Sequence, residues 1–98
     1  MTYDELIAGA PVVLVEFYAT WCPHCRHMMP VVEQVKELVA GKAEIYQLDI
    51  DQNQDTANDA VVESVPTFLL YQDGKLRWRQ SGEIDAEVLL GKIQEIAG

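Results

Sequence analysis

The strongest constraint on the fold is the segment of residues 12–18, which carries β-branched and aromatic side chains at nearly every position. A strand that is apolar on both faces is typical of the centre of a sheet that helices cover on both sides. Patterns of helices and strands follow one another along the chain in the order α-β-α-β-α-β-β-α. The sequence therefore predicts an α/β sandwich with a mixed sheet, in a single domain over residues 1–98.

Apolar periodicity, capping residues, glycine and proline place the other elements. The helix after the first strand is expected to begin near Cys22 or Pro23 and to end at Gly41. Asp55 and Asp85 are the expected N-caps of a short helix and of the last helix. The remaining expectations are a helix at residues 2–9, strands at residues 43–50, 67–71 and 76–81, a turn at Asp73-Gly74, and a buried helix face made of Val88, Leu89, Ile93 and Ile96.

Acidic residues outnumber basic ones by 16 to 7, which gives the chain a net charge of −9. This balance argues against binding to nucleic acid or to an anionic membrane surface, because both need clustered lysine and arginine. No apolar run is long enough to span a membrane, and no signal-peptide pattern opens the sequence. We therefore expect a cytoplasmic protein, or an extracytoplasmic one if a leader has been removed. The presence of only two cysteines excludes a scaffold held by several disulfides.

Both cysteines lie in the segment Trp21-Cys22-Pro23-His24-Cys25, directly after the predicted central strand and at the start of a helix. Cysteines three residues apart on a first helical turn face the same side, close enough for one disulfide. Cys22 is nearest the positive end of the helix dipole and the free backbone N–H groups, which favour its thiolate. Cys25 is expected to be the more covered, ordinary thiol. An exposed thiolate beside a shielded thiol is the arrangement that disulfide exchange requires.

The segment of residues 15–26 resembles the active-site block of the thioredoxin family, and Pro30 follows at a matching place. The resemblance covers nearly the whole chain from Val12. It implies the thioredoxin fold and a thiol–disulfide oxidoreductase in which Cys22 is the nucleophile and Cys25 the resolving thiol. Further matches in order and spacing are residues 48–51, residues 64–68, Asp73-Gly74 and Gly82.

The resemblance also implies roles outside the cysteine pair. Pro66 matches the family's cis-proline, which turns the backbone of Val65 toward an extended substrate. Glu16 matches a buried acid that carries the proton of the resolving cysteine, and a structural or partly solvated glutamate is the alternative. Trp21 is expected to shield the site and to offer partners an apolar face. The expected substrate-binding residues are Trp21, Pro23, Val65, Pro66 and Gly82.

One departure from the family pattern is the dipeptide between the cysteines. The family's commonest pair is Gly-Pro, whereas Pro23-His24 is the pair of the oxidising, DsbA-like branch. The His24 imidazole is expected to donate a hydrogen bond to the Cys22 thiolate or to place positive charge near it. Either effect stabilises the reduced form and predicts a redox potential above that of thioredoxin. The alternative is a ring that points to solvent.

Two further departures concern the buried acid and the sheet. Gln47 stands where many thioredoxins have a lysine near the acid, so Glu16 should be harder to ionise. The family's N-terminal edge strand has no counterpart in the pattern. The central sheet should therefore have about four strands, with residues 43–50 at an edge.

Two other chemistries fit the motif poorly. Cys22, His24, Cys25 and His27 are zinc-ligand types, but four ligands within six consecutive residues do not readily form a tetrahedral cage. A c-type haem site needs a histidine directly after the second cysteine, where this chain has Arg26. We therefore expect no metal and no organic cofactor.

These observations predict a monomeric oxidoreductase that acts on the thiols and disulfides of proteins. Electrons would come from a redox partner such as a thioredoxin reductase, or would pass to a thiol oxidant. A cytoplasmic location favours net reduction, whereas Pro23-His24 favours oxidation or isomerisation. The alternative function is a non-catalytic, thioredoxin-like module that binds peptides or proteins in the groove around Trp21, Val65-Pro66 and Gly82.

Overall fold

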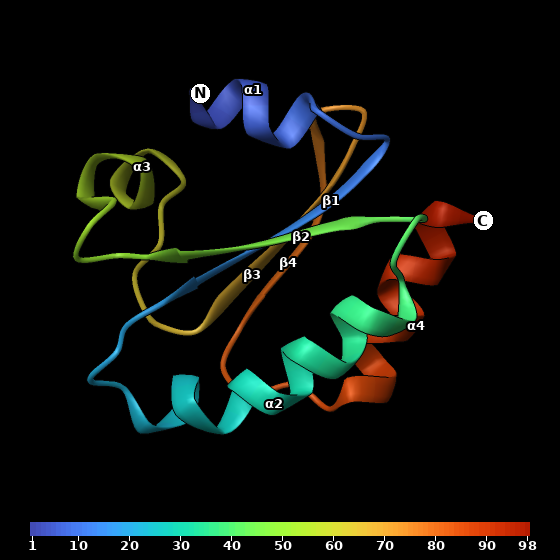
Figure 1. Ribbon diagram of the computed structural model, residues 1–98. Helices are drawn as coiled ribbons and strands as arrows, with labels where there is room; N and C mark the ends of the chain where they lie inside the picture. Colours follow the sequence, from blue (N-terminus) through green and yellow to red (C-terminus); the bar gives the residue numbers. More distant parts are fainter.

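The computed structural model describes all of residues 1–98 and shows one sheet with helices on both sides (Figure 1). Its eight elements follow one another in the predicted order. The α/β fold expected from the sequence is thus confirmed. The elements are α1 Tyr3–Ala8, β1 Val12–Tyr18, α2 Pro23–Leu38, β2 Glu44–Asp49, α3 Gln54–Asp59, β3 Thr67–Gln72, β4 Lys75–Ser81 and α4 Ala86–Ala97.

The four strands form one mixed sheet in the order β2-β1-β3-β4. β1 is parallel to β2 and antiparallel to β3, and β3 is antiparallel to β4. The parallel pair needs a long crossover, which α2 supplies. β2 lies at an edge of the sheet, as the sequence predicts. In this register Glu16 lies between Gln47 on β2 and Phe68 on β3.

The side chains of β1 alternate between two apolar cores, one on each face of the sheet. Val12 and Leu14 belong to a core shared with α2 and α4, whereas Val13, Val15 and Phe17 belong to a core shared with α1 and α3. Figure 1 shows α2 and α4 on one side of the sheet and α1 and α3 on the other. This burial on both sides is why the sequence of β1 is apolar on both faces.

The ends of two helices differ from the prediction. α2 ends at Leu38 rather than at Gly41, because Val39 already serves as its C-cap. Gly41 lies in the turn that follows, with a φ of +83° that glycine adopts without strain. Asn53, and not Asp55, is the N-cap of α3. Asp55 lies in the first turn, where the helix dipole favours an acidic side chain.

The last helix differs from the prediction in its buried face. Asp85 occupies the N-cap position of α4, as expected, but its side chain makes no capping hydrogen bond. Leu89 and Ile93 are fully buried, whereas 45% of Val88 is exposed. Consecutive residues lie about 100° apart around a helix, so a face centred on Leu89 turns Val88 toward water.

Candidate active site

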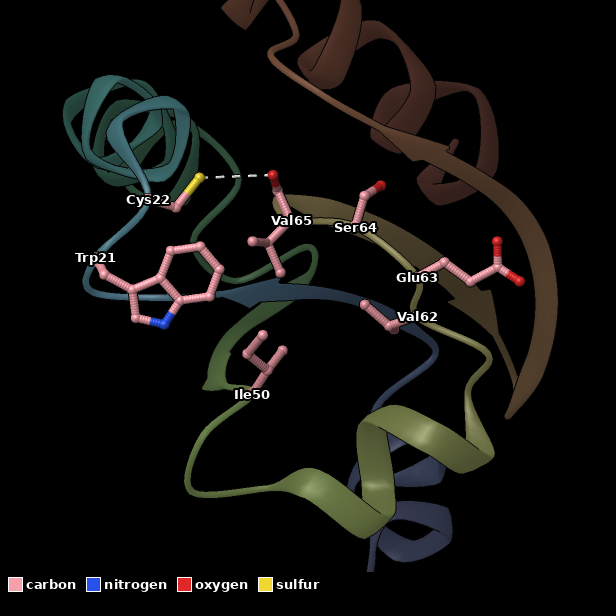
Figure 2. A pocket seen from close by; sticks show the side chains of 7 residues that line it. All are labelled: Trp21, Cys22, Ile50, Val62, Glu63, Ser64 and Val65. Carbon is pink, nitrogen blue, oxygen red and sulfur yellow. Dashed lines mark hydrogen bonds between the residues drawn. The ribbon is translucent and has the colours of Figure 1, made fainter.

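The two cysteines lie where β1 ends and α2 begins, beside a pocket of about 310 Å³. The pocket is built from three separate parts of the chain: the start of α2, the end of β2 and the loop before β3 (Figure 2). The sequence motif accounts for the first part and for Val65, but not for the rest of the wall. The lining residues are Trp21, Cys22, Ile50, Val62, Glu63, Ser64 and Val65.

Cys22 is the N-cap of α2, and its sulfur faces the pocket wall. Only 5% of the residue is exposed, so the exposed thiolate expected from the sequence is instead a covered sulfur at the edge of the pocket. The cover comes from the loop before β3, whose Val65 carbonyl accepts a hydrogen bond from Cys22 Sγ at 3.6 Å (Figure 2). A substrate therefore reaches Cys22 through the pocket.

The environment of Cys22 favours its thiolate. The pKa of the thiol is lowered, chiefly because the backbone N–H of Cys25 stabilises the charged sulfur. The thiol of Cys25, the backbone N–H of His24 and the charge of Arg26 lower the pKa further, while burial opposes them. This is the effect of a helix N-terminus that the sequence predicts for Cys22.

Cys25 is in the opposite situation. It lies in the first turn of α2, is only 2% exposed, and packs with Ala19 and Cys22. Burial raises the pKa of its thiol to about 11, and the nearby Cys22 and Glu16 add to this effect. The two sulfurs thus differ strongly in acidity, and only Cys22 lines the pocket.

Glu16 is a carboxyl group inside the sheet. It is 1% exposed on the central strand, and Gln47 Nε2 donates a hydrogen bond to its Oε1 at 2.9 Å. Burial raises the pKa of Glu16 to about 6, and the hydrogen bond from Gln47 only partly offsets this. Its charge acts on the pKa of Cys25. The carboxyl group is therefore close enough to the buried thiol to influence it and titrates near neutral pH.

The loop before β3 completes the site on the side opposite α2. The Val65–Pro66 peptide bond is cis. The backbone N–H of Gly82 donates a hydrogen bond to the Pro66 carbonyl at 2.8 Å, which ties the loop to the end of β4. Gly82 has a φ of +94°, a conformation that side chains with a Cβ rarely adopt. Gly82 thus holds the loop through the Pro66 carbonyl and does not itself line the pocket.

Trp21 forms the outer rim of the pocket, with 62% of the residue exposed. Its indole Nε1 donates a hydrogen bond to Asp51 Oδ2 at 2.9 Å, which fixes the orientation of the ring. A large apolar ring held open to solvent offers contact area to a partner at low entropic cost. Sequence reasoning matched the segment that contains Asp51 but did not identify this contact.

The His24 side chain lies elsewhere than expected. Its imidazole Nδ1 is 2.6 Å from Glu83 Oε2, and no hydrogen bond joins the ring to Cys22. The imidazole-to-thiolate hydrogen bond expected from the sequence is therefore not formed, and the backbone N–H of His24 is the group that acts on Cys22. Glu83 is 59 residues away in the chain, and no sequence signal pairs the two.

The buried acid leads to a prediction about stability and pH. The folded pKa of Glu16, about 6, exceeds its ordinary value of 4.5, so the fold favours the neutral form. This cost is absent below pH 4.5 and complete above about pH 6, where it amounts to about 2 kcal/mol. The Glu16→Gln variant should therefore be about 2 kcal/mol more stable than the wild type at pH 8 and equally stable at pH 4. Urea unfolding at both pH values measures the difference.

The matched control is Glu33→Gln, which removes an exposed carboxylate from α2. It should change the stability by the same small amount at both pH values. If the difference in unfolding free energy between Glu16→Gln and the wild type were equally large at pH 4 and pH 8, a raised pKa at this position would be contradicted.

The sequence of this chain is similar to the sequences of known proteins. The sequence model of the family described as Thioredoxin matches residues 1–95. A thioredoxin from Chlorobaculum thiosulfatiphilum is 34% identical over 94 residues, which cover 96% of this chain and 87% of that protein. The chloroplastic thioredoxin Y of Oryza sativa subsp. japonica is also 34% identical over 94 residues, which cover 95% of this chain and 56% of that protein.

Solved structures agree with this comparison. A mutant thioredoxin from Halobacterium salinarum NRC-1 has a TM-score of 0.89 and 34% sequence identity, covering 97% of this chain and 82% of that one. The chain spans little more than half the length of the chloroplastic relatives and most of the length of the bacterial one.

None of its helices combines the length and the apolar character needed to cross a bilayer.

Proposed function

The chain belongs to the thioredoxin family, and we propose that it is a thiol–disulfide oxidoreductase that exchanges disulfides with cysteines of other proteins. The observation that carries this proposal is the unequal pair of sulfurs. Cys22 has a lowered pKa and lines the pocket, whereas Cys25 is buried with a pKa of about 11. A reactive thiolate next to a reserved thiol is what a two-step exchange needs.

The exchange proceeds through two successive thiol–disulfide exchange steps. The Cys22 thiolate attacks one sulfur of a substrate disulfide, forms a mixed disulfide, and releases the other substrate sulfur as a thiolate that takes up a proton. Cys25 then loses its proton and attacks the Cys22 sulfur. The Cys22–Cys25 disulfide forms, and the second substrate sulfur leaves. Two electrons have passed from the dithiol to the substrate, and the reverse sequence oxidises a substrate.

We assign the proton of Cys25 to Glu16 in the second step. A thiol with a pKa of about 11 ionises too rarely near neutral pH to attack without a base. Glu16 has a pKa of about 6 and acts electrostatically on Cys25, so it is suited to accept the proton at neutral pH.

The pocket is the proposed binding surface for an extended segment of the substrate. Trp21 and Val65 supply apolar contacts on either side of Cys22, and the segment would run beside the cis Val65–Pro66 bond. Pro23 fixes the first position of α2 and so the place of the Cys22 sulfur, and Gly82 supports the loop. We propose further that the protein acts as a monomer and that it exchanges electrons with a thioredoxin reductase or a thiol oxidant.

We propose that His24 tunes the potential through its backbone N–H and its tie to Glu83. The N–H lowers the pKa of Cys22 and so stabilises the reduced form. The contact between Glu83 Oε2 and His24 Nδ1, at 2.6 Å, ties the residue that carries this N–H to the connection after β4. Equilibration with a glutathione buffer measures the outcome, which we expect to lie above the potential of thioredoxin.

Reduction of insulin by dithiothreitol tests the proposed function. The reduced chain should accelerate the precipitation of insulin B chains several-fold over dithiothreitol alone, because Cys22 attacks disulfides faster than an ordinary thiol of high pKa. Turbidity against time is the measurement. A folded chain that gives no acceleration would favour the alternative function, a thioredoxin-like module that only binds its partner in the pocket.

A further inference from the structure

Three metal-ligand side chains meet on the surface beside the cysteine pair. His24 and His27 lie three residues apart on α2, and Glu83 comes from the connection between β4 and α4. Their ligand atoms all lie within 4.8 Å of one another. Glu83 Oε2 is 2.6 Å from His24 Nδ1 and 3.4 Å from His27 Nδ1. His24 and His27 are the only histidines of the chain, and the side chains of both turn toward the Glu83 carboxylate.

The spacing of these atoms suits a small cation. Ligands of a tetrahedral zinc ion, each about 2.0–2.1 Å from the metal, lie roughly 3.3 Å from one another. The distance from Glu83 to His27 already has this value, and the shorter one to His24 needs to open by less than 1 Å. The two imidazole rings are about two-thirds exposed and the Glu83 side chain is 42% exposed, so rotation of these side chains can bring ligand atoms that now lie within 4.8 Å of one another to this spacing.

We propose that His24, His27 and Glu83 bind a divalent transition-metal ion, with Zn²⁺ the best match. Two imidazole nitrogens and one carboxylate oxygen are ligands that zinc prefers, whereas Mg²⁺ and Ca²⁺ require sites made of oxygen atoms. Three protein ligands leave the fourth position to water. The ligand set contains no cysteine, so it differs from the crowded set of residues 22–27 that the sequence argues against.

The proposed metal site does not depend on redox activity. It lies at the start of α2, two residues from Cys22, but Cys22 Sγ is directed to the Val65 carbonyl and lines the pocket. The site therefore exists whether the cysteines exchange disulfides or not. A test must still keep the two thiols from binding the metal themselves, because thiolates are strong zinc ligands.

The experiment is titration of ZnCl₂ into the full chain carrying Cys22→Ser and Cys25→Ser, without an affinity tag, followed by calorimetry. We expect one zinc ion per chain. His27→Gln and Glu83→Gln in this background should each weaken binding about tenfold or more, because each removes a ligand. Glu33→Gln, an exposed carboxylate elsewhere on α2, is the matched control and should leave the affinity unchanged. Excess Mg²⁺ should not displace the zinc.

A second measurement locates the ion. Because the chain has two histidines, their ring resonances are the only imidazole signals in an NMR spectrum, and both should shift when zinc is added. Circular dichroism checks that the variants, which change exposed side chains, remain folded. The proposal is overturned if no zinc binds, if His27→Gln and Glu83→Gln bind zinc as well as the background chain does, or if Mg²⁺ competes equally.

Discussion

Replacing Cys25 by serine should turn the chain into a trap for its clients. Cys22 would still attack a client disulfide, because its lowered pKa owes most to the backbone N–H of residue 25, which the substitution keeps. The mixed disulfide would then persist, since a serine hydroxyl does not attack disulfides and no other cysteine exists in the chain. Incubation with insulin and quenching with N-ethylmaleimide should give a covalent complex on a non-reducing gel. The wild type should give almost none.

The complementary variant serves as the control for trapping. Cys22→Ser removes the nucleophile and leaves only the buried thiol of Cys25, whose pKa burial raises, so it should trap nothing and should not accelerate insulin reduction. Dithiothreitol should release the client from the Cys25→Ser complex. If both single variants trapped insulin equally, the assignment of one attacking and one resolving sulfur would be wrong.

The largest effect on stability is expected at Phe17 on the central strand. Its side chain is fully buried, and its ring packs at 5.9 Å against the ring of Tyr3 on α1. Phe17→Ala should cost about 3–5 kcal/mol, because it removes buried apolar surface and leaves a cavity. A domain of this size has a total stability of about 5–15 kcal/mol, so the variant should lose a large share of it. Urea unfolding at neutral pH measures the loss.

Leu76→Ala is the matched control, since it also truncates an apolar strand residue. Leu76 lies on the edge strand β4 and is 48% exposed, so its truncation should cost well under 1 kcal/mol. Similar losses for the two variants would mean that the core shared by β1, α1 and α3 does not carry the stability that its burial indicates.

Local patterns were enough to predict the architecture. The apolar character of β1 on both faces required helices on both sides, and the structure has them. Asp73 and Gly74 both have positive φ values, as the tight turn expected between two antiparallel strands requires. The helix ends at Leu38 and Asn53 were missed by three and two positions, because neighbouring residues of similar propensity compete for a cap.

The candidate site was only partly predictable. Both cysteines and Glu16 follow from their positions on α2 and β1, which are local features of the sequence. The cover over Cys22 depends on Val65, 43 residues further along the chain, and the partner of His24 is 59 residues away. Such contacts are set by how the loops meet at one end of the sheet. Periodicity and spacing do not contain that information, so the exposure of Cys22 was mispredicted, and the hydrogen bond expected from the His24 ring to Cys22 is not formed.

Selective alkylation is the most direct test of the inequality between the two thiols. The fully reduced chain is treated with a limiting amount of iodoacetamide at pH 7, and the label is located by mass spectrometry after digestion. Cys22 should carry nearly all of the label, because its pKa is lowered and it lines the pocket, while Cys25 is buried with a pKa of about 11. Equal labelling of Cys22 and Cys25, at the rate of a free cysteine, would contradict the account.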